Sequence, residues 1–230
     1  MNKVSPSVFK VIKSCRYLAN KLAKIPSAIH ETYNISENYR RDYQNSDNRI
    51  DVIQKIVDSM GFYLGNLHKI NVRIIKDDQS IFDFKVNTKG VAEKPTNYSF
   101  AGQWNGSNVQ CITIANEQQY RFDNCMAILA HEYTHCFLEQ HNIICEFLNN
   151  EIFTDIAAAY LGFGFLLLRG YQSYGFSIGY INNSSISFTI GAAVVSRKWK
   201  FFPTLMKCKS VKEFVLFLFA YIVFTGSIKS

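Results

Sequence analysis

The sequence has no CxxC pair, little proline and little glycine. Its six cysteines fit neither a zinc ribbon nor a small disulfide scaffold, so we expect reduced and mostly buried thiols. Four prolines and twelve glycines exclude collagen-like and low-complexity architectures. A disordered chain is also excluded, because 48% of the 230 residues are apolar and 15% are aromatic. The chain is long enough to bury a sizeable core.

Long apolar runs are also missing. The two longest candidates are Ile156–Leu168, with thirteen residues, and Phe214–Phe224, with eleven. Because a spanning helix needs roughly 20 apolar residues, both runs predict buried helices, and membrane association is an alternative that is not favoured. The first thirty residues are interrupted by Lys10, Lys13 and Arg16, which is untypical of a secretory signal. We therefore expect a cytoplasmic protein.

The net charge of +7 is concentrated at the two ends. Residues 1–30 hold six basic and no acidic residues, and residues 196–230 hold seven basic residues and one acidic residue. Residues 31–195 carry the remaining 12 basic and 17 acidic residues. Basic ends can attract an anionic membrane, nucleic acid or an acidic partner, although solvated faces are commoner. No nucleic-acid-binding module is recognisable, so nucleic acid is not the expected partner.

The N-terminal pattern is helical and polar. Apolar residues at steps of three and four predict an amphipathic helix over residues 7–25. Residues 27–50 are polar and predict a linker or a solvated helix. We therefore expect residues 1–45 to form a basic amphipathic helix with a polar linker, ahead of a main domain at 46–230. A further helix is predicted over residues 50–60.

The pattern then changes to strands and back to helices. Alternating apolar and polar residues predict strands at 70–75 and 81–86, and residues 98–104 and 108–114 predict a hairpin around Asn105-Gly106. Helices are expected at 123–140, 145–168, 184–199 and 211–224. The expected fold class is α+β, with a small, partly antiparallel sheet packed on the first of these helices and a mostly helical C-terminal half.

One motif indicates chemistry. His131-Glu132-Tyr133-Thr134-His135 has the pattern HExxH. On a helix, residues four apart lie on one face, so His131 and His135 can reach one cation. Glu132 is rotated by roughly 100° from His131, which places its carboxylate beside the metal, where it can take a proton from a metal-bound water.

A catalytic zinc needs a third protein ligand and an open position. The candidates are Glu139, His141, Glu146 and Glu151. On a continuous helix, Glu139 and His141 would lie about 12 and 15 Å along the axis from the first histidine. His141 matches the HExxHxxGxxH spacing of the metzincins, but Leu138 stands where that family has the glycine that turns the chain back. Helix geometry therefore disfavours Glu139 and His141, whereas Glu146 and Glu151 stay open.

Residues 150–155 read NExxxD. Together with HExxH, this pattern resembles the gluzincin metallopeptidases over roughly residues 98–170, and Thr154–Gly164 resembles a stretch found in uncharacterised bacterial predicted metallopeptidases. The resemblance implies that Glu151 is the third zinc ligand and that Asp155 accepts a hydrogen bond from a ligand histidine, His131 in particular. It also implies a zincin-like domain with its sheet at about 70–114, active-site helices at about 123–168 and C-terminal helices at about 184–224.

By the same resemblance, the chain is a zinc-dependent peptidase that acts on a peptide or protein substrate, with Glu132 as general base. The strand 108–114 is a candidate for pairing with an extended substrate. Candidates for the oxyanion donor are Tyr160, Tyr171, Tyr174 and Tyr180, with Tyr180 preferred. Two alternatives stay open: a catalytically inactive zinc-binding protein that binds a partner or nucleic acid through its basic ends, and a membrane-associated metalloprotease.

Overall fold

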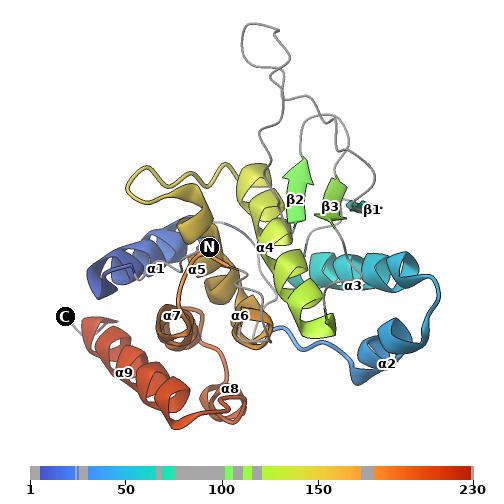
Figure 1. Ribbon diagram of the computed structural model, residues 1–230. Coiled ribbons are helices and arrows are strands. Elements are labelled where there is room, and N and C mark those ends of the chain that lie inside the picture. The colour runs from blue at the N-terminus through green and yellow to red at the C-terminus, as the bar shows by residue number, and fades with distance from the viewer. Residues whose placement is uncertain are drawn as a thin grey trace, which may run out of the picture.

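The computed structural model describes residues 6–23, 25, 31–65, 69–75, 102–105, 111–115, 121–171 and 179–228. The α+β class is confirmed: the described part is mostly helical and contains a small sheet (Figure 1). The helices before the sheet are α1 (Val8–Leu22), α2 (Glu37–Asn45) and α3 (Arg49–Leu64). Those after it are α4 (Phe122–Gln140), α5 (Asn150–Ala158), α6 (Gly164–Tyr171), α7 (Asn183–Ser196), α8 (Phe201–Leu205) and α9 (Val211–Ile228).

The described strands form a mixed sheet in the order β1-β3-β2. They are β1 (Asn71–Ile75), β2 (Gly102–Asn105) and β3 (Cys111–Ala115). The central strand β3 runs parallel to β1 and antiparallel to β2, so the sheet is not simply antiparallel. β2 and β3 contact α4, and β1 contacts α3, which fixes α4 beside the sheet (Figure 1). The strand predicted at 81–86 and the turn at Gly106 lie outside the described residues.

The polar region 27–50 contains the helix α2, whose only buried residue is Tyr43, which agrees with the solvated helix predicted there as one alternative. Several predicted helix boundaries were wrong. α3 continues past residue 60 to Leu64. The helix predicted from residue 145 begins at Asn150, because the Asn149 side chain caps it by accepting from the backbone N–H groups of Glu151 and Ile152. α8 was not predicted.

The helix predicted over 145–168 is also interrupted. A π-helical turn, η2 (Ala159–Phe163), separates α5 from α6. Gly162 in this turn has φ 113°, a conformation that other residues rarely adopt. A Cβ atom there would lie 1.9 Å from the Tyr63 hydroxyl oxygen, and the Gly162 carbonyl accepts from the Tyr33 backbone N–H at 3.1 Å. Gly162 therefore lets the segment ahead of α2 and the end of α3 pack closely on the helix.

One hydrophobic cluster connects helices from α1 to α9. α4 is buried along most of its length, α1 packs on α5 and α7, and α7 packs on α9. Within the described chain, the continuous helical stretch Asn150–Tyr171 is long and apolar enough to cross a membrane by length and composition alone. Its most apolar window is 89% buried inside the protein, as in a core helix. All six cysteines are described and are free thiols.

Candidate metal centre

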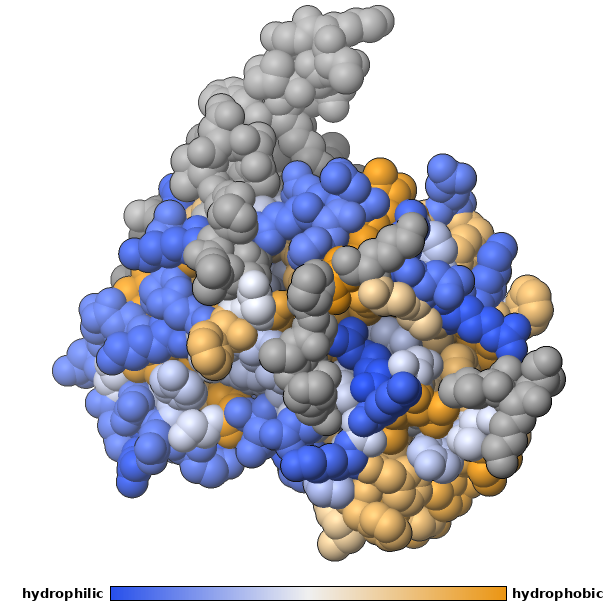
Figure 2. All heavy atoms as spheres, turned by 180° about the vertical axis from the view of Figure 1, so that it is seen from behind, coloured by the Kyte–Doolittle hydropathy of each residue, from blue (hydrophilic) through white to orange (hydrophobic). Residues whose placement is uncertain are grey.

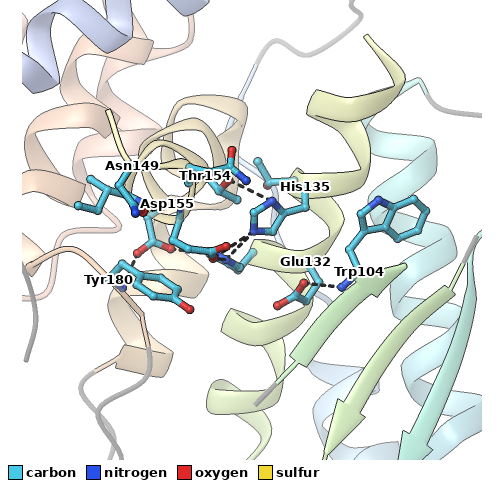
Figure 3. Close-up of polar contacts among 12 residues, drawn as sticks. Trp104, Glu132, His135, Asn149, Thr154, Asp155 and Tyr180 are labelled. Carbon is cyan, nitrogen blue, oxygen red and sulfur yellow. Dashed lines mark hydrogen bonds and ion pairs between the residues drawn. The ribbon is translucent and has the colours of Figure 1, made fainter. Parts of the chain in front are cut away.

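The HExxH motif lies in the middle of α4, and NExxxD forms the first turns of α5. α4 and α5 contact each other. Because His131 and His135 are one turn apart, their rings lie on the same side of α4, with centroids 4.7 Å apart. The Asn149 cap places Glu151 in the first turn of α5, where the helix dipole stabilises a carboxylate. Figure 3 shows His135 of α4 close to Thr154 and Asp155 of α5.

Three ligand atoms converge at this point. His131 Nε2 lies 3.0 Å from His135 Nε2 and 3.0 Å from Glu151 Oε2, and His135 Nε2 lies 3.3 Å from Glu151 Oε2. A tetrahedral zinc ion with bonds of about 2.05 Å would hold its ligands about 3.3 Å apart. The three atoms therefore have the mutual spacing of three corners of such a coordination shell, and the group can hold a metal ion.

The opposite ring nitrogens have their own partners. His131 Nδ1 lies 2.8 Å from Asp155 Oδ1, and His135 Nδ1 lies 3.3 Å from Thr154 Oγ1, whose proton is donated to the Asn150 carbonyl at 2.9 Å. Both acceptors favour a proton on Nδ1, which leaves the Nε2 lone pairs of both rings directed at each other and at the Glu151 carboxylate. Three lone pairs at these distances repel one another unless a proton or a metal ion lies between them.

Asp155 is fully buried and fully hydrogen-bonded. Besides His131, it accepts from the Tyr171 hydroxyl at 2.5 Å and from the backbone N–H groups of Tyr180 at 2.7 Å and Ile181 at 3.1 Å. Gly179, with φ 87°, makes this approach feasible, because a Cβ atom there would lie 2.0 Å from the Tyr171 ring. The loop before α7 therefore fixes the carboxylate that orients His131.

Glu132 lies outside the three-ligand group but beside it. Its Oε2 accepts from the Trp104 backbone N–H of β2 at 2.7 Å, and only 7% of the residue is exposed (Figure 3). Burial raises the pKa of this carboxyl, against the lowering effect of the charges of His131 and His135. A carboxylate held out of water with a raised pKa accepts a proton more readily than an exposed one, as a general base requires.

The surrounding charges favour a cation. Burial lowers the pKa of His131, but the hydrogen bonds with Asp155 and Glu151 outweigh it and raise the pKa to about 10. The hydrogen bonds from His131 and His135 hold the pKa of Glu151 far below its usual range. With Glu132, Glu151 and Asp155 around it, the position next to the histidines attracts positive charge.

The four tyrosines predicted as candidate oxyanion donors differ in where they lie. The Tyr180 ring stacks on His131 with centroids 5.6 Å apart, whereas the Tyr171 hydroxyl is engaged with Asp155. Tyr160 is buried near Cys15 and Ser196, and Tyr174 lies outside the described residues. Burial is the main cause that raises the pKa of Tyr180, to about 12, so its hydroxyl keeps its proton at neutral pH.

The competing third ligands do not join the group. α4 continues to Gln140, so His141 caps its end and packs on Phe137. The Glu139 carboxylate accepts from the Trp104 indole N–H, and Glu146 is exposed in the segment before α5. Among the described residues, Glu151 alone completes a group of ligand atoms with the two histidines.

The sequence did not reveal the roles of three residues that contact the site residues. Thr154 follows Glu151 by three residues, so helical spacing could have placed it on the same face. Tyr171 was considered only as an oxyanion donor, yet its hydroxyl contacts Asp155. The Trp104 backbone N–H has no side-chain signature, and its contact with Glu132 depends on how the sheet packs against α4.

Comparisons of the chain with protein-family models, with curated proteins and with solved structures find no match. The functional interpretation therefore depends on the site itself.

Proposed function

We propose that this protein is a zinc-dependent peptidase with a zincin-like active site. The observation that carries the proposal is the convergence of His131, His135 and Glu151 next to the buried carboxylate of Glu132. Two imidazoles and one carboxylate are a donor set typical of catalytic zinc, with one position left for water or substrate. When bound there, zinc would polarise the attacking water and the scissile carbonyl.

The protein's own residues supply the rest of the chemistry. Glu132 takes the proton from the attacking water and delivers it to the leaving amine, because its raised pKa suits both transfers. Asp155 and Thr154 hold the ligand rings in one orientation. Tyr180, stacked on His131 and protonated at neutral pH, is the candidate hydrogen-bond donor to the developing oxyanion.

An edge strand supports a peptide substrate. The strand at 108–114 was the predicted site of pairing with an extended substrate. This prediction was wrong, because β3 is central and hydrogen-bonded on both sides. β2 lies at the edge of the described sheet, and its Trp104 contacts Glu132. An extended peptide that adds to β2 would run past the carboxylate that accepts the proton.

Metal content tests the ligand set. Zinc per chain is measured by elemental analysis on the wild type, on Glu151→Ala and on Glu146→Ala, after purification with added zinc. We expect about one zinc in the wild type and in the Glu146→Ala control, and clear loss in Glu151→Ala. One zinc in all three proteins would move the third ligand elsewhere, and no zinc in any of them would remove the metal site.

Activity tests the general base. Hydrolysis of a mixture of unstructured peptides is compared between the wild type, Glu132→Gln and Glu139→Gln, each with its zinc content measured. Glu132→Gln should retain zinc and lose hydrolysis by about a hundredfold or more, whereas Glu139→Gln should retain both. Zinc binding without hydrolysis in the wild type would instead favour an inactive zinc-binding protein.

A further inference from the structure

The outer face of α9 and the adjoining helix α8 carry an unusual number of exposed apolar side chains. Phe202 and Met206 extend from α8 and the turn after it, and Val211, Phe214, Val215, Phe219 and Ile222 extend from α9. We call these seven residues the α8–α9 apolar face. Figure 2 shows apolar side chains gathered at the lower right of that view, where α9 lies. An exposed patch of this kind on a folded protein marks an interaction site.

Packing of α8 on α9 and of α9 on α7 holds the α8–α9 apolar face in place. Phe201 of α8 packs on Phe202 and on the α9 rings of Phe217 and Tyr221, with centroids 4.5–5.5 Å apart, so the two helices form one unit. On its inner side α9 is held against α7. A Cβ atom at Gly191 would lie 2.4 Å from the Phe217 carbonyl oxygen, and Ala220 is fully buried. α9 therefore presents one face outward while the other belongs to the core.

Exposed lysines lie before α8 and around the start of α9. Lys198, Lys200, Lys209 and Lys212 are all exposed and lie between or beside Phe202, Met206 and Val211 in the chain. Residues 196–230 hold seven basic residues against Glu213, and Glu213 is buried and accepts from the Lys209 backbone N–H at 2.8 Å. The surroundings of the apolar face are thus strongly positive.

We infer that the α8–α9 apolar face docks on an anionic membrane surface, with α9 lying in the plane of the interface. Apolar residues would enter the boundary between headgroups and acyl chains, and the lysines would contact anionic headgroups. A spanning orientation does not fit, because the inner face of α9 is packed on α7. A symmetric pairing of two copies through this face would bring their lysines together, which is unfavourable. This inference is independent of the proposed metal site.

Vesicle sedimentation tests the inference on the full chain. Vesicles of phosphatidylcholine alone are compared with vesicles containing about one-third phosphatidylserine. We expect binding to the anionic vesicles, weakened by high salt, and much weaker binding to the neutral ones. Val215→Ser/Ile222→Ser should weaken binding about tenfold, and Lys200→Ser/Lys212→Ser should do the same at low salt. Both pairs are exposed, so thermal unfolding of each variant should match the wild type closely.

α3 supplies matched controls on the opposite side of the molecule (Figure 1). Phe62 is 84% exposed and Lys55 is also exposed, and Phe62→Ser/Lys55→Ser should leave vesicle binding unchanged. Absence of wild-type binding, equal binding to neutral vesicles, or equal binding by the α9 variant would overturn the inference. So would a lipid-free dimer, measured by sedimentation, that Val215→Ser/Ile222→Ser dissociates, because the apolar face would then bind a second copy.

Discussion

Nδ1 of His131 lies 2.8 Å from Oδ1 of Asp155, and this contact is completely buried. It connects the two sequence motifs through a pair of side chains 24 residues apart. Since an ionised carboxylate accepts only, the contact places the proton of the neutral ring on Nδ1 and turns the lone pair of Nε2 toward His135 and Glu151. Asp155 thereby orients a ring that could hold a metal ion, without belonging to the group of ligand atoms.

Asp155→Asn should weaken zinc binding by about 10–100-fold. The amide keeps the volume of the side chain but removes the charge that fixes the His131 proton and increases the basicity of the ring. Zinc affinity is measured by competition with a chelator, and thermal unfolding in the absence of metal separates lost affinity from lost folding. Asp42→Asn on the exposed face of α2 is the matched control. Equal zinc affinity in the two variants would show that Asp155 does not act through His131.

Replacing Thr154 should also weaken zinc binding, but by less than replacing Asp155. Its hydroxyl donates to the Asn150 carbonyl and is left to accept from His135 Nδ1. Thr154→Val keeps the shape but removes the acceptor, so we expect zinc affinity to fall by about tenfold, at the low end of such effects. Thr154→Ser should restore most of it, because the hydroxyl returns. If both variants bind zinc equally weakly, the role of Thr154 is in packing.

Gly179→Ala should disturb the loop that holds Asp155. Ala would have to adopt φ 87° and would meet the Tyr171 ring. We expect the free energy of unfolding to fall by about 2 kcal/mol or more, measured by denaturant unfolding, together with weaker zinc binding. Gly226→Ala in α9, where a Cβ atom meets nothing within 4 Å, should be neutral or slightly stabilising. A loss of stability without any loss of zinc affinity would contradict the proposed role of the loop.

The sequence was informative where chemistry follows helical spacing. HExxH has helical spacing, so the approach of His131 and His135 could be expected from the sequence, and the resemblance carried by NExxxD added Glu151 to them. Local sterics also argued correctly against His141, since without a glycine at Leu138 α4 continues to Gln140, but they did not by themselves select Glu151.

Contacts that depend on packing could not be predicted in the same way. The Trp104 backbone N–H reaches Glu132 only because β2 forms the sheet edge against α4, and strand order has no local sequence signal. The π turn at Gly162 depends on the approach of Tyr63 from α3, about 100 residues earlier in the chain. The parallel pairing of β1 with β3 likewise joins segments that are distant in the sequence, so no local pattern predicts it.

Glu132→Gln should change the pH dependence of stability in the metal-free protein. Burial raises the folded-state pKa of Glu132 above its unfolded value, so its favourable contribution is complete below the unfolded pKa and is lost as pH rises through the folded one. Glutamine has no such loss and can still accept from the Trp104 N–H. Thermal unfolding in chelator should therefore show the stability of the variant, relative to wild type, increasing as pH rises above the unfolded pKa of about 4.

The exposed residue Glu146 provides the control for this series, because its side chain stays in water in both states. Glu146→Gln should track the wild type closely across the same pH range. A constant stability difference between Glu132→Gln and wild type would show that the carboxyl does not titrate differently on folding. The proton-transfer role proposed for Glu132 would then lose its electrostatic support, because that role requires a carboxyl whose raised pKa comes from the folded site.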